Sequence, residues 1–296
     1  MIADFATLLS ISVIVFPVAS MLAVGLSFTL REIAGPLRHP HKVFRALVAN
    51  FVLVPLLASG IARLLGLAPP FAAGLMLVGT AAGAPFLVQL TLAARRDPAL
   101  SATLIVLLMP VTVVYMPLVI PHVVADASVR ASAIVTPLLL TLILPLIIGL
   151  AIDATRPRLA ARMRPAAGKI ASVALLALVG STVVVNAPVF WNLVGTGAIS
   201  AAVLLTAGAF AIGYLLATPG GGRRTILGLG TAQRNIAAAM VVAADDFQDR
   251  NVLVMVVVVS VLDLLVLFPI AWLLRRRRST GHVAPPPGND VAGSAA

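Results

Sequence analysis

The sequence predicts an all-α polytopic membrane protein, a bundle of nine transmembrane helices. Of its 296 residues, 60% are hydrophobic and only 10% are charged, whereas a soluble domain carries about 25% charged residues. Apolar segments of about the 20 residues needed to cross a bilayer follow one another along the chain. They lie near 5–30, 43–66, 71–94, 99–121, 133–153, 168–188, 193–217, 224–246 and 251–274. A water-soluble fold is therefore excluded.

The first segment is expected to be retained as a helix, not removed as a signal peptide. Its start holds Asp4 where a signal peptide would carry Lys or Arg, and its positive charges, Arg31 and Arg38, follow it. The other segments are rich in aliphatic residues, because aromatic residues make up only 5% of a chain that contains 22 Gly and 21 Pro. This composition favours helices that pack closely and are often interrupted.

The Lys and Arg residues are concentrated in every second loop between the predicted spans. Seventeen of them fall in one set of alternate loops, and only Arg63, Arg130 and Arg250 fall in the other. Because cytoplasmic loops are the basic ones, the N-terminus is expected outside and the C-terminus inside, in a bacterial inner (plasma) membrane. The net charge of +11 is assigned to these loops, so nucleic acid is not an expected partner.

Residues 1–278 are expected to form a single transmembrane domain that contains an inverted repeat, with copies near 43–121 and 193–274. Gly79–Ala81 recurs as Gly230–Ala232, 151 residues later, and Pro117 matches Pro269 at an offset of 152. The matching segments are the third and eighth crossings, which run in opposite directions because they are five crossings apart. The tail 279–296 is expected to be disordered and cytoplasmic.

Both repeat-related segments are expected to be discontinuous near mid-membrane. The first has Gly79, Gly83 and Pro85 at its centre, and the second has Gly228 and Gly230 before the polar run 231–235. Backbone groups freed at that depth are tolerated only beside protein or a wet cavity, which predicts a shared polar cavity. The alternative is that these residues only permit close packing and kinks.

Arg234 is the most informative candidate for a binding residue. It lies about ten residues from either end of its segment, roughly 15 Å at the helical rise, and a mid-membrane arginine costs about 2.5 kcal/mol or more. Its fork of donors suits a carboxylate. The alternative role of Arg234 is a structural ion pair with Asp263, which lies in the middle of the last segment. The two roles of Arg234 are compatible. Asp263 could instead carry a proton or bind a cation.

Neutral hydrogen-bonding residues complete the expected substrate-binding set. They are Gln233, Asn235, Thr80, Thr231 and Gln89. The alternative for Gln89 is a structural hydrogen bond between packed helices. Asn50 has no counterpart in the repeat and is assigned to packing. The expected partners are the lipid bilayer and a small organic anion, and the oligomeric state is left open.

Enzymatic activity and resident cofactors are not expected. The chain has no Cys, its four His residues lie in loops or the tail, and no HExxH, GxSxG or phosphate-binding Gly-rich loop occurs. We expect a secondary active transporter that works by alternating access. The alternative from another class is a membrane-embedded sensor or scaffold with a transporter fold and no net transport.

Three stretches give the sequence a resemblance to the bile acid:sodium symporter superfamily, in its bacterial sodium-dependent transporter type. They are MLAVGLSFTL at 21–30, LAARRDPALS at 92–101 and GLGTAQRNIAAAM at 228–240, within a similarity over roughly 17–275. The resemblance implies a core and a panel domain, with two crossing broken helices in the core, here 71–94 and 224–246. It also implies the nine-helix type, which lacks the first helix of ten-helix members.

The sequence departs from this family where sodium is bound. Sodium-coupled members carry Glu–x–Gly–x–Gln–Asn in the second crossing helix, and here that pattern falls on 230–235, where Gly230 replaces Glu and Arg234 replaces Gln. The family's Ser–Asn pair in the first crossing helix is replaced by apolar residues at 84–88. Sodium remains possible, but its typical oxygen ligands are missing. The guanidinium is expected to replace a bound sodium ion, which makes transport sodium-independent or proton-coupled.

Overall fold

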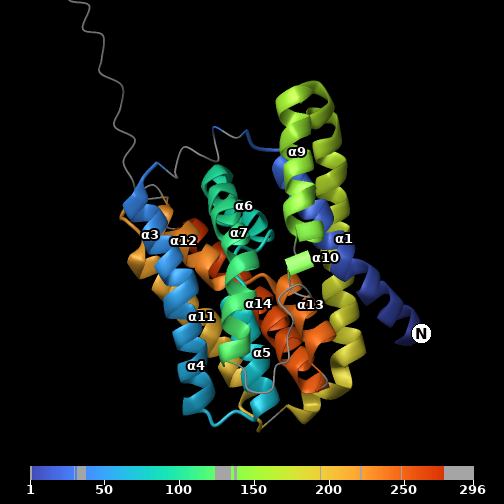
Figure 1. Ribbon diagram of the computed structural model, residues 1–296, viewed down its shortest axis with the longest axis vertical. Coiled ribbons are helices and arrows are strands. Elements are labelled where there is room, and N and C mark those ends of the chain that lie inside the picture. Colours follow the sequence, from blue (N-terminus) through green and yellow to red (C-terminus); the bar gives the residue numbers. More distant parts are fainter. Residues whose placement is uncertain are drawn as a thin grey trace, which may run out of the picture.

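The regular elements of the computed structural model are all helical over the residues that it describes, which are 2–29, 31, 38–123, 135–136, 139–193, 195–220, 222–247 and 249–276. Figure 1 shows their arrangement. The predicted tail 279–296 lies outside the described residues. The elements are α1 (Ile2–Gly25), α3 (Pro40–Val48), the π-helix η1 (Ala49–Leu53), α4 (Val54–Leu64), α5 (Pro69–Thr80), α6 (Leu87–Ala93), α7 (Pro98–Val123), the π-helix η2 (Leu139–Ile143), α9 (Leu144–Thr155), α10 (Pro157–Asn192), α11 (Ala198–Leu216), α12 (Arg223–Ala232), α13 (Ile236–Asp246) and α14 (Arg250–Arg276).

Five stretches of continuous helix among the described residues are long and apolar enough to cross a bilayer. They are Asp4–Gly25, Pro40–Leu64, Pro98–His122, Ala198–Leu216 and Arg250–Arg275, and each agrees with one predicted segment. Two shorter apolar helices, Pro69–Thr80 and Leu139–Thr155, fall in two further predicted segments. An all-helical membrane protein is therefore confirmed, whereas the number of nine crossings stays a prediction.

The sixth predicted segment is longer than expected. A loop was expected between 153 and 168, but α10 begins at Pro157 and continues to Asn192. Proline is well suited to the first turn of a helix because its missing N–H has no partner there in any case. The residues that follow are mostly Ala and Arg, which are strong helix formers, so the basic stretch continues the helix instead of forming a loop.

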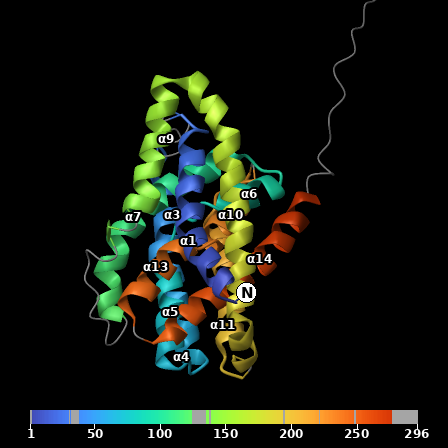
Figure 2. The ribbon, with the colours of Figure 1, turned by 90° about the vertical axis from the view of Figure 1, so that its right-hand side faces the viewer.

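Helices α1, α9 and α10 pack on one another and form a unit that we call the three-helix group. In Figure 1 this group, with η2 leading into α9, lies beside the remaining helices, which we call the central group, and in Figure 2 α1, α9 and α10 face the viewer. Gly149 lets α1 and α9 cross closely, because a Cβ there would lie 2.7 Å from the carbonyl oxygen of Leu22. The groups meet where α10 contacts α14 and where α1 contacts α13.

A proline produces the π-helix η1 within the second predicted segment. Pro55 has no N–H, so it cannot bond the carbonyl oxygen of Phe51 four residues earlier. The Tyr115 hydroxyl of α7 donates to that oxygen at 2.6 Å instead. Asn50 lies in this irregular turn and is completely buried. Single π-turns of this kind often lie at functional sites.

Candidate substrate and coupling site

The two repeat-related segments are interrupted, as expected. The first breaks between Thr80, where α5 ends, and Leu87, where α6 begins. Gly83 lies in this break with a φ of +81°, a left-handed conformation, and a Cβ there would lie 2.9 Å from the backbone nitrogen of Met109. The second segment breaks between Ala232 and Ile236.

The two breaks touch each other, and we call residues 78–83 and 231–235 the crossing. The backbone N–H of Asn235 donates to the carbonyl oxygen of Ala81 at 2.8 Å. The Thr112 hydroxyl of α7 holds the first break from the other side. It donates to the carbonyl oxygen of Ala82 at 2.9 Å, and the N–H of Ala82 donates to it at 3.1 Å. These backbone groups of Ala81, Ala82 and Asn235 are thus bonded within the protein.

Arg234 lies at the centre of the crossing and is 1% exposed. Its Nε donates to the carbonyl oxygen of Val78 at 3.1 Å, and its Nη2 donates to that of Gly79 at 2.6 Å. Its Nη1 donates to the carbonyl oxygen of Thr231 at 3.2 Å and to Asn50 Oδ1 at 2.9 Å. One guanidinium therefore links the ends of two half-helices to the neighbouring span.

The charge of Arg234 is complementary to its surroundings. Helices α5 and α12 both end at the crossing, and the C-terminal end of a helix carries a partial negative charge on its unpaired carbonyl groups. A cation is stabilised beside such ends, and a planar guanidinium serves several oxygens at once. Arg234 is therefore a fixed cation that caps two helix ends.

No direct contact between the Arg234 guanidinium and the Asp263 carboxylate is found among the described residues, and the alternative role of the two residues as an ion pair stays a prediction. Asp263 lies in the middle of α14 and is 1% exposed. Its Oδ1 accepts a hydrogen bond from the Thr206 hydroxyl of α11, and its Oδ2 has no hydrogen-bond partner among the described residues. The guanidinium bonds helix-end carbonyls instead, which are closer partners for its fork of donors. The two charged groups still interact electrostatically.

Gln233 and Asn235 lie beside Arg234 and line a small cavity of about 50 Å³. Gln233 Oε1 is buried without a hydrogen-bond partner among the described residues, so this side chain has an unused acceptor. Asn235 caps α13, because its Oδ1 accepts from the backbone N–H of Ala238 at 3.1 Å. Gln233 is therefore available to a ligand in this cavity, while Asn235 also has a structural role.

Thr80 and Thr231 are completely buried, and neither lines the cavities that contain Gln89 and Gln233. The Thr80 hydroxyl donates to the carbonyl oxygens of Met76 and Leu77 on its own helix. The Thr231 hydroxyl accepts from Asn50 Nδ2 at 3.3 Å. Their part in substrate binding stays a prediction, and here both support the crossing.

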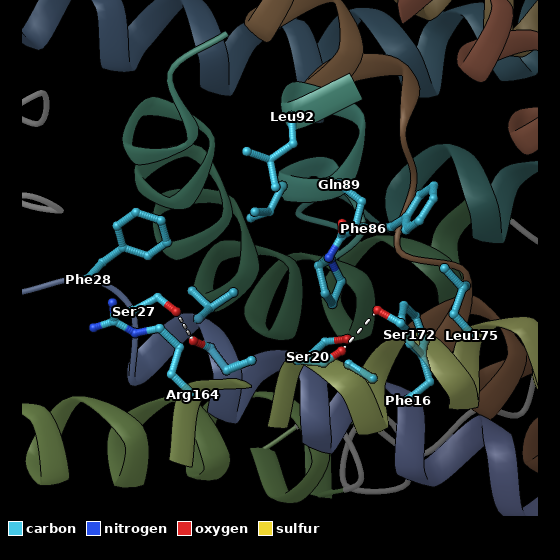
Figure 3. A pocket seen from close by; sticks show the side chains of 16 residues that line it. Phe16, Ser20, Ser27, Phe28, Phe86, Gln89, Leu92, Arg164, Ser172 and Leu175 are labelled. Carbon is cyan, nitrogen blue, oxygen red and sulfur yellow. Dashed lines mark hydrogen bonds between the residues drawn. The ribbon is translucent and has the colours of Figure 1, made fainter. Parts of the chain in front are cut away.

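Gln89 lines a larger cavity, of about 220 Å³, between the three-helix group and α6. Arg164, Ser20, Ser27 and Ser172 line the same cavity. In Figure 3 the Arg164 guanidinium lies beside Phe28 and Ser27 at one end of the cavity, and Gln89 lies nearer its middle. Arg164 extends from α10, and its Nε donates to the carbonyl oxygen of Leu26 at 3.0 Å. No other hydrogen bond of its guanidinium is found within the part of the chain that the structure describes. This cavity therefore offers a cation, an amide and hydroxyl groups.

The two cavities are neighbours. They share four lining residues, which are Phe16, Pro85, Phe86 and Leu175. Pro85 and Phe86 belong to the break in the first interrupted helix, and Phe16 and Leu175 belong to the three-helix group. The space beside Arg164 therefore leads toward the crossing, along the boundary between the two groups of helices.

Sequence reasoning missed Asn50, Thr112 and Arg164. Asn50 was assigned to packing for lack of a repeat counterpart, although an amide side chain within an apolar span, five residues before Pro55, was a usable signal. Thr112 follows Pro110 in the middle of an apolar segment and was not considered. Arg164 was counted only among the basic loop residues, because residues 157–167 were not recognised as the start of α10. The sequence also did not show which face of this helix lies toward the cavity.

Comparison with known proteins relates the chain to a family of membrane transporters. Residues 14–193 match the sodium bile acid symporter family. The probable sodium/metabolite cotransporter BASS1, chloroplastic, of Arabidopsis thaliana is 37% identical over 82 residues, which cover 28% of this chain and 20% of that protein. The probable sodium/metabolite cotransporter BASS3, chloroplastic, of the same plant is 26% identical over 195 residues, 66% of this chain and 45% of that protein.

This chain thus matches less than half the length of either curated relative. The family and both relatives are transporters and not enzymes, in agreement with the lack of catalytic motifs. The chain belongs to the sodium bile acid symporter family.

Proposed function

We propose that the protein is a secondary active transporter of a small organic anion that works by alternating access. The boundary between the three-helix group and the central group carries the substrate, and movement of one group against the other opens it to either side. The observation that carries this proposal is the polar cavity at that boundary, which contains Arg164 and Gln89 and continues toward two interrupted helices. Binding sites of secondary transporters commonly lie at such places.

The order of elements supports an inverted repeat and nine crossings. In the copy 43–121 a continuous span, α3–η1–α4, is followed by the interrupted pair α5 and α6 and by the long helix α7. In the copy 193–274 the order is α11, the interrupted pair α12 and α13, and α14. The residues that follow the first half-helices, Ala81 and Gln233, are 152 residues apart, within one residue of the 151-residue offset between Gly79–Ala81 and Gly230–Ala232. Nine spans would leave the termini on opposite sides of the membrane, and the basic loops on the cytoplasmic side favour an N-terminus outside and a C-terminus in the cytoplasm.

Arg164 is the proposed anchor for the anionic group of the substrate. Its bond to Leu26 orients the guanidinium, and its two Nη groups, which have no hydrogen-bond partner among the residues that the structure describes, are proposed to hold a carboxylate. Gln89 lines the same cavity and is the proposed second polar contact. Phe16, Phe28 and Phe86 line the cavity as well and provide an apolar wall. The volume of about 220 Å³ lies below the roughly 300–1,000 Å³ of drug-sized sites, which favours a small metabolite anion over a steroid.

Arg234 and Asp263 have proposed roles in coupling. The carbonyl oxygens of Val78, Gly79 and Thr231 are oxygens of the kind that bind a metal ion, and they accept from the guanidinium of Arg234. We therefore assign the charge of a coupling sodium ion to Arg234, so that transport requires no sodium. Asp263, with an unpartnered Oδ2 in the middle of a span, is the proposed proton carrier.

Substitution of Arg164 tests the substrate site. Arg164→Gln is expected to weaken anion binding at least tenfold, because a hydrogen-bonded charge contributes about 1.5–3 kcal/mol and about 1.4 kcal/mol is tenfold in affinity. Uptake of labelled small organic acids by counterflow in proteoliposomes measures the effect.

Arg158→Gln is the matched control, since Arg158 lies on the same helix outside this cavity and is exposed. Counterflow equal in the Arg164→Gln protein and in the wild type would place the anion elsewhere. The absence of counterflow in the wild type with every acid in the set would contradict transport and favour a sensor or scaffold.

A further inference from the structure

A basic cleft on the central group lies apart from both cavities described above. Its cationic lining residues are Lys42 and Arg45 of α3 and Arg223 of α12, and no carboxylate is among the residues that line it. Its floor is apolar and is formed by Leu100 and Leu104 of α7, Leu216 of α11 and Leu227 of α12. None of its lining residues lines the 220 Å³ or the 50 Å³ cavity.

The cleft lies where membrane spans end. Lys42 and Arg45 are in the first two turns of the span Pro40–Leu64, and Leu216 is the last residue of the span Ala198–Leu216. The ends of apolar spans lie at the level of the lipid headgroups. The cations of the cleft are therefore expected at headgroup depth, with its leucine side chains directed toward the acyl-chain region.

The first turns of the span Pro40–Leu64, formed by α3, have the composition of a membrane interface. Phe44 is 68% exposed between Lys42 and Arg45, so an aromatic ring and two cations alternate on one short segment. Basic residues together with a large exposed apolar side chain are typical of helices that lie at a membrane surface. The surroundings of the cleft therefore point to lipid and not to solvent.

We propose that this cleft binds the phosphate group of an anionic phospholipid. Lys42, Arg45 and Arg223 come from elements far apart in sequence and surround one opening, which is the arrangement that neutralises a phosphate. The volume of about 60 Å³ suits a single phosphate group better than a metabolite with a carbon skeleton. The leucine floor continues from the cationic rim and accommodates the first carbons of an acyl chain.

Native mass spectrometry of the full chain tests this proposal. The protein is exchanged into an uncharged detergent with equal amounts of phosphatidylglycerol and phosphatidylcholine. The wild type is expected to retain phosphatidylglycerol at least tenfold over phosphatidylcholine. The triple variant Lys42→Gln, Arg45→Gln, Arg223→Gln is expected to lose this preference, and Lys42→Arg, Arg45→Lys, Arg223→Lys is expected to keep it.

The control removes three charges from another basic region, with Arg156→Gln, Arg158→Gln and Arg162→Gln at the start of α10. It is expected to retain phosphatidylglycerol like the wild type. If the triple variant does not fold, the single variants Arg45→Gln and Arg223→Gln are each expected to reduce retention about threefold. Equal retention in the cleft variants and the control would overturn the proposal. Displacement of the lipid by 10 mM inorganic phosphate would show that the cleft takes free phosphate and would overturn it as well.

Discussion

Replacing Arg234 by methionine is expected to lower the melting temperature of the purified protein by about 6–12 °C. The change removes a donor from three carbonyl oxygens, those of Val78, Gly79 and Thr231, and from the amide oxygen of Asn50. The Val78 oxygen keeps one bond, from the N–H of Ala81. A buried polar group left without a partner costs about 1–3 kcal/mol, so a loss of about 3 kcal/mol is a low figure for this cluster. About 1 kcal/mol corresponds to roughly 2–4 °C in a protein of this size.

Two further variants separate charge from size. Arg234→Lys keeps the charge but offers a compact ammonium group in place of a planar fork, so an intermediate melting temperature is expected. Arg158→Met makes the same chemical change as Arg234→Met at an exposed site on α10, and no shift beyond about 2 °C is expected. An Arg234→Met protein that melts within 2 °C of the wild type would contradict the role of the guanidinium as a cap for two helix ends.

Asp263→Asn is expected to abolish uptake that is driven by a proton gradient, with a loss of tenfold or more, while counterflow exchange continues. Asparagine has nearly the same shape and keeps an oxygen that accepts from the Thr206 hydroxyl, so the packing of α14 on α11 is retained. It cannot bind or release a proton. Proteoliposomes with an imposed pH difference measure the driven uptake, and the same vesicles at equal pH measure exchange.

Asp97→Asn is the matched control for this experiment. Asp97 is exposed, and its Oδ1 accepts from the backbone N–H of Ala99, a bond that asparagine also makes. Driven uptake is expected to be unchanged in this variant. If Asp263→Asn retains the wild-type response to the pH difference, Asp263 is not the proton carrier and its contact with Thr206 is structural.

The interruptions of the two repeat-related helices were predictable because their causes are local. Pro85 removes a backbone donor, Gly83 permits a left-handed residue, and a polar run beginning at Thr231 follows two glycines. Such effects of proline and glycine on the backbone can be predicted from the sequence because they do not depend on contacts between distant segments. The start of α10 at Pro157 was missed for the opposite reason, since a run of arginines was taken as a sign of a loop although arginine also favours helix.

The detailed site was less predictable because it depends on contacts between distant segments. The burial of Arg234 could be predicted from its place in an apolar segment. Its partners in α5 could not, because they are backbone carbonyl groups, which every residue has. Asn50 meets Arg234 across 184 residues of chain, and its role is evident only once the spans are packed. Arg164 reaches the large cavity because α10 presents that face to α1, which again is a matter of tertiary packing.

The sodium requirement of uptake tests directly whether the Arg234 guanidinium takes the place of a coupling ion. Uptake of a labelled organic acid is measured in proteoliposomes with sodium in the buffer and with sodium replaced by choline. Because helix-end oxygens of the crossing already accept from a fixed cation, the rates and the apparent affinity are expected to be the same in both buffers. A strict requirement for sodium would contradict this assignment.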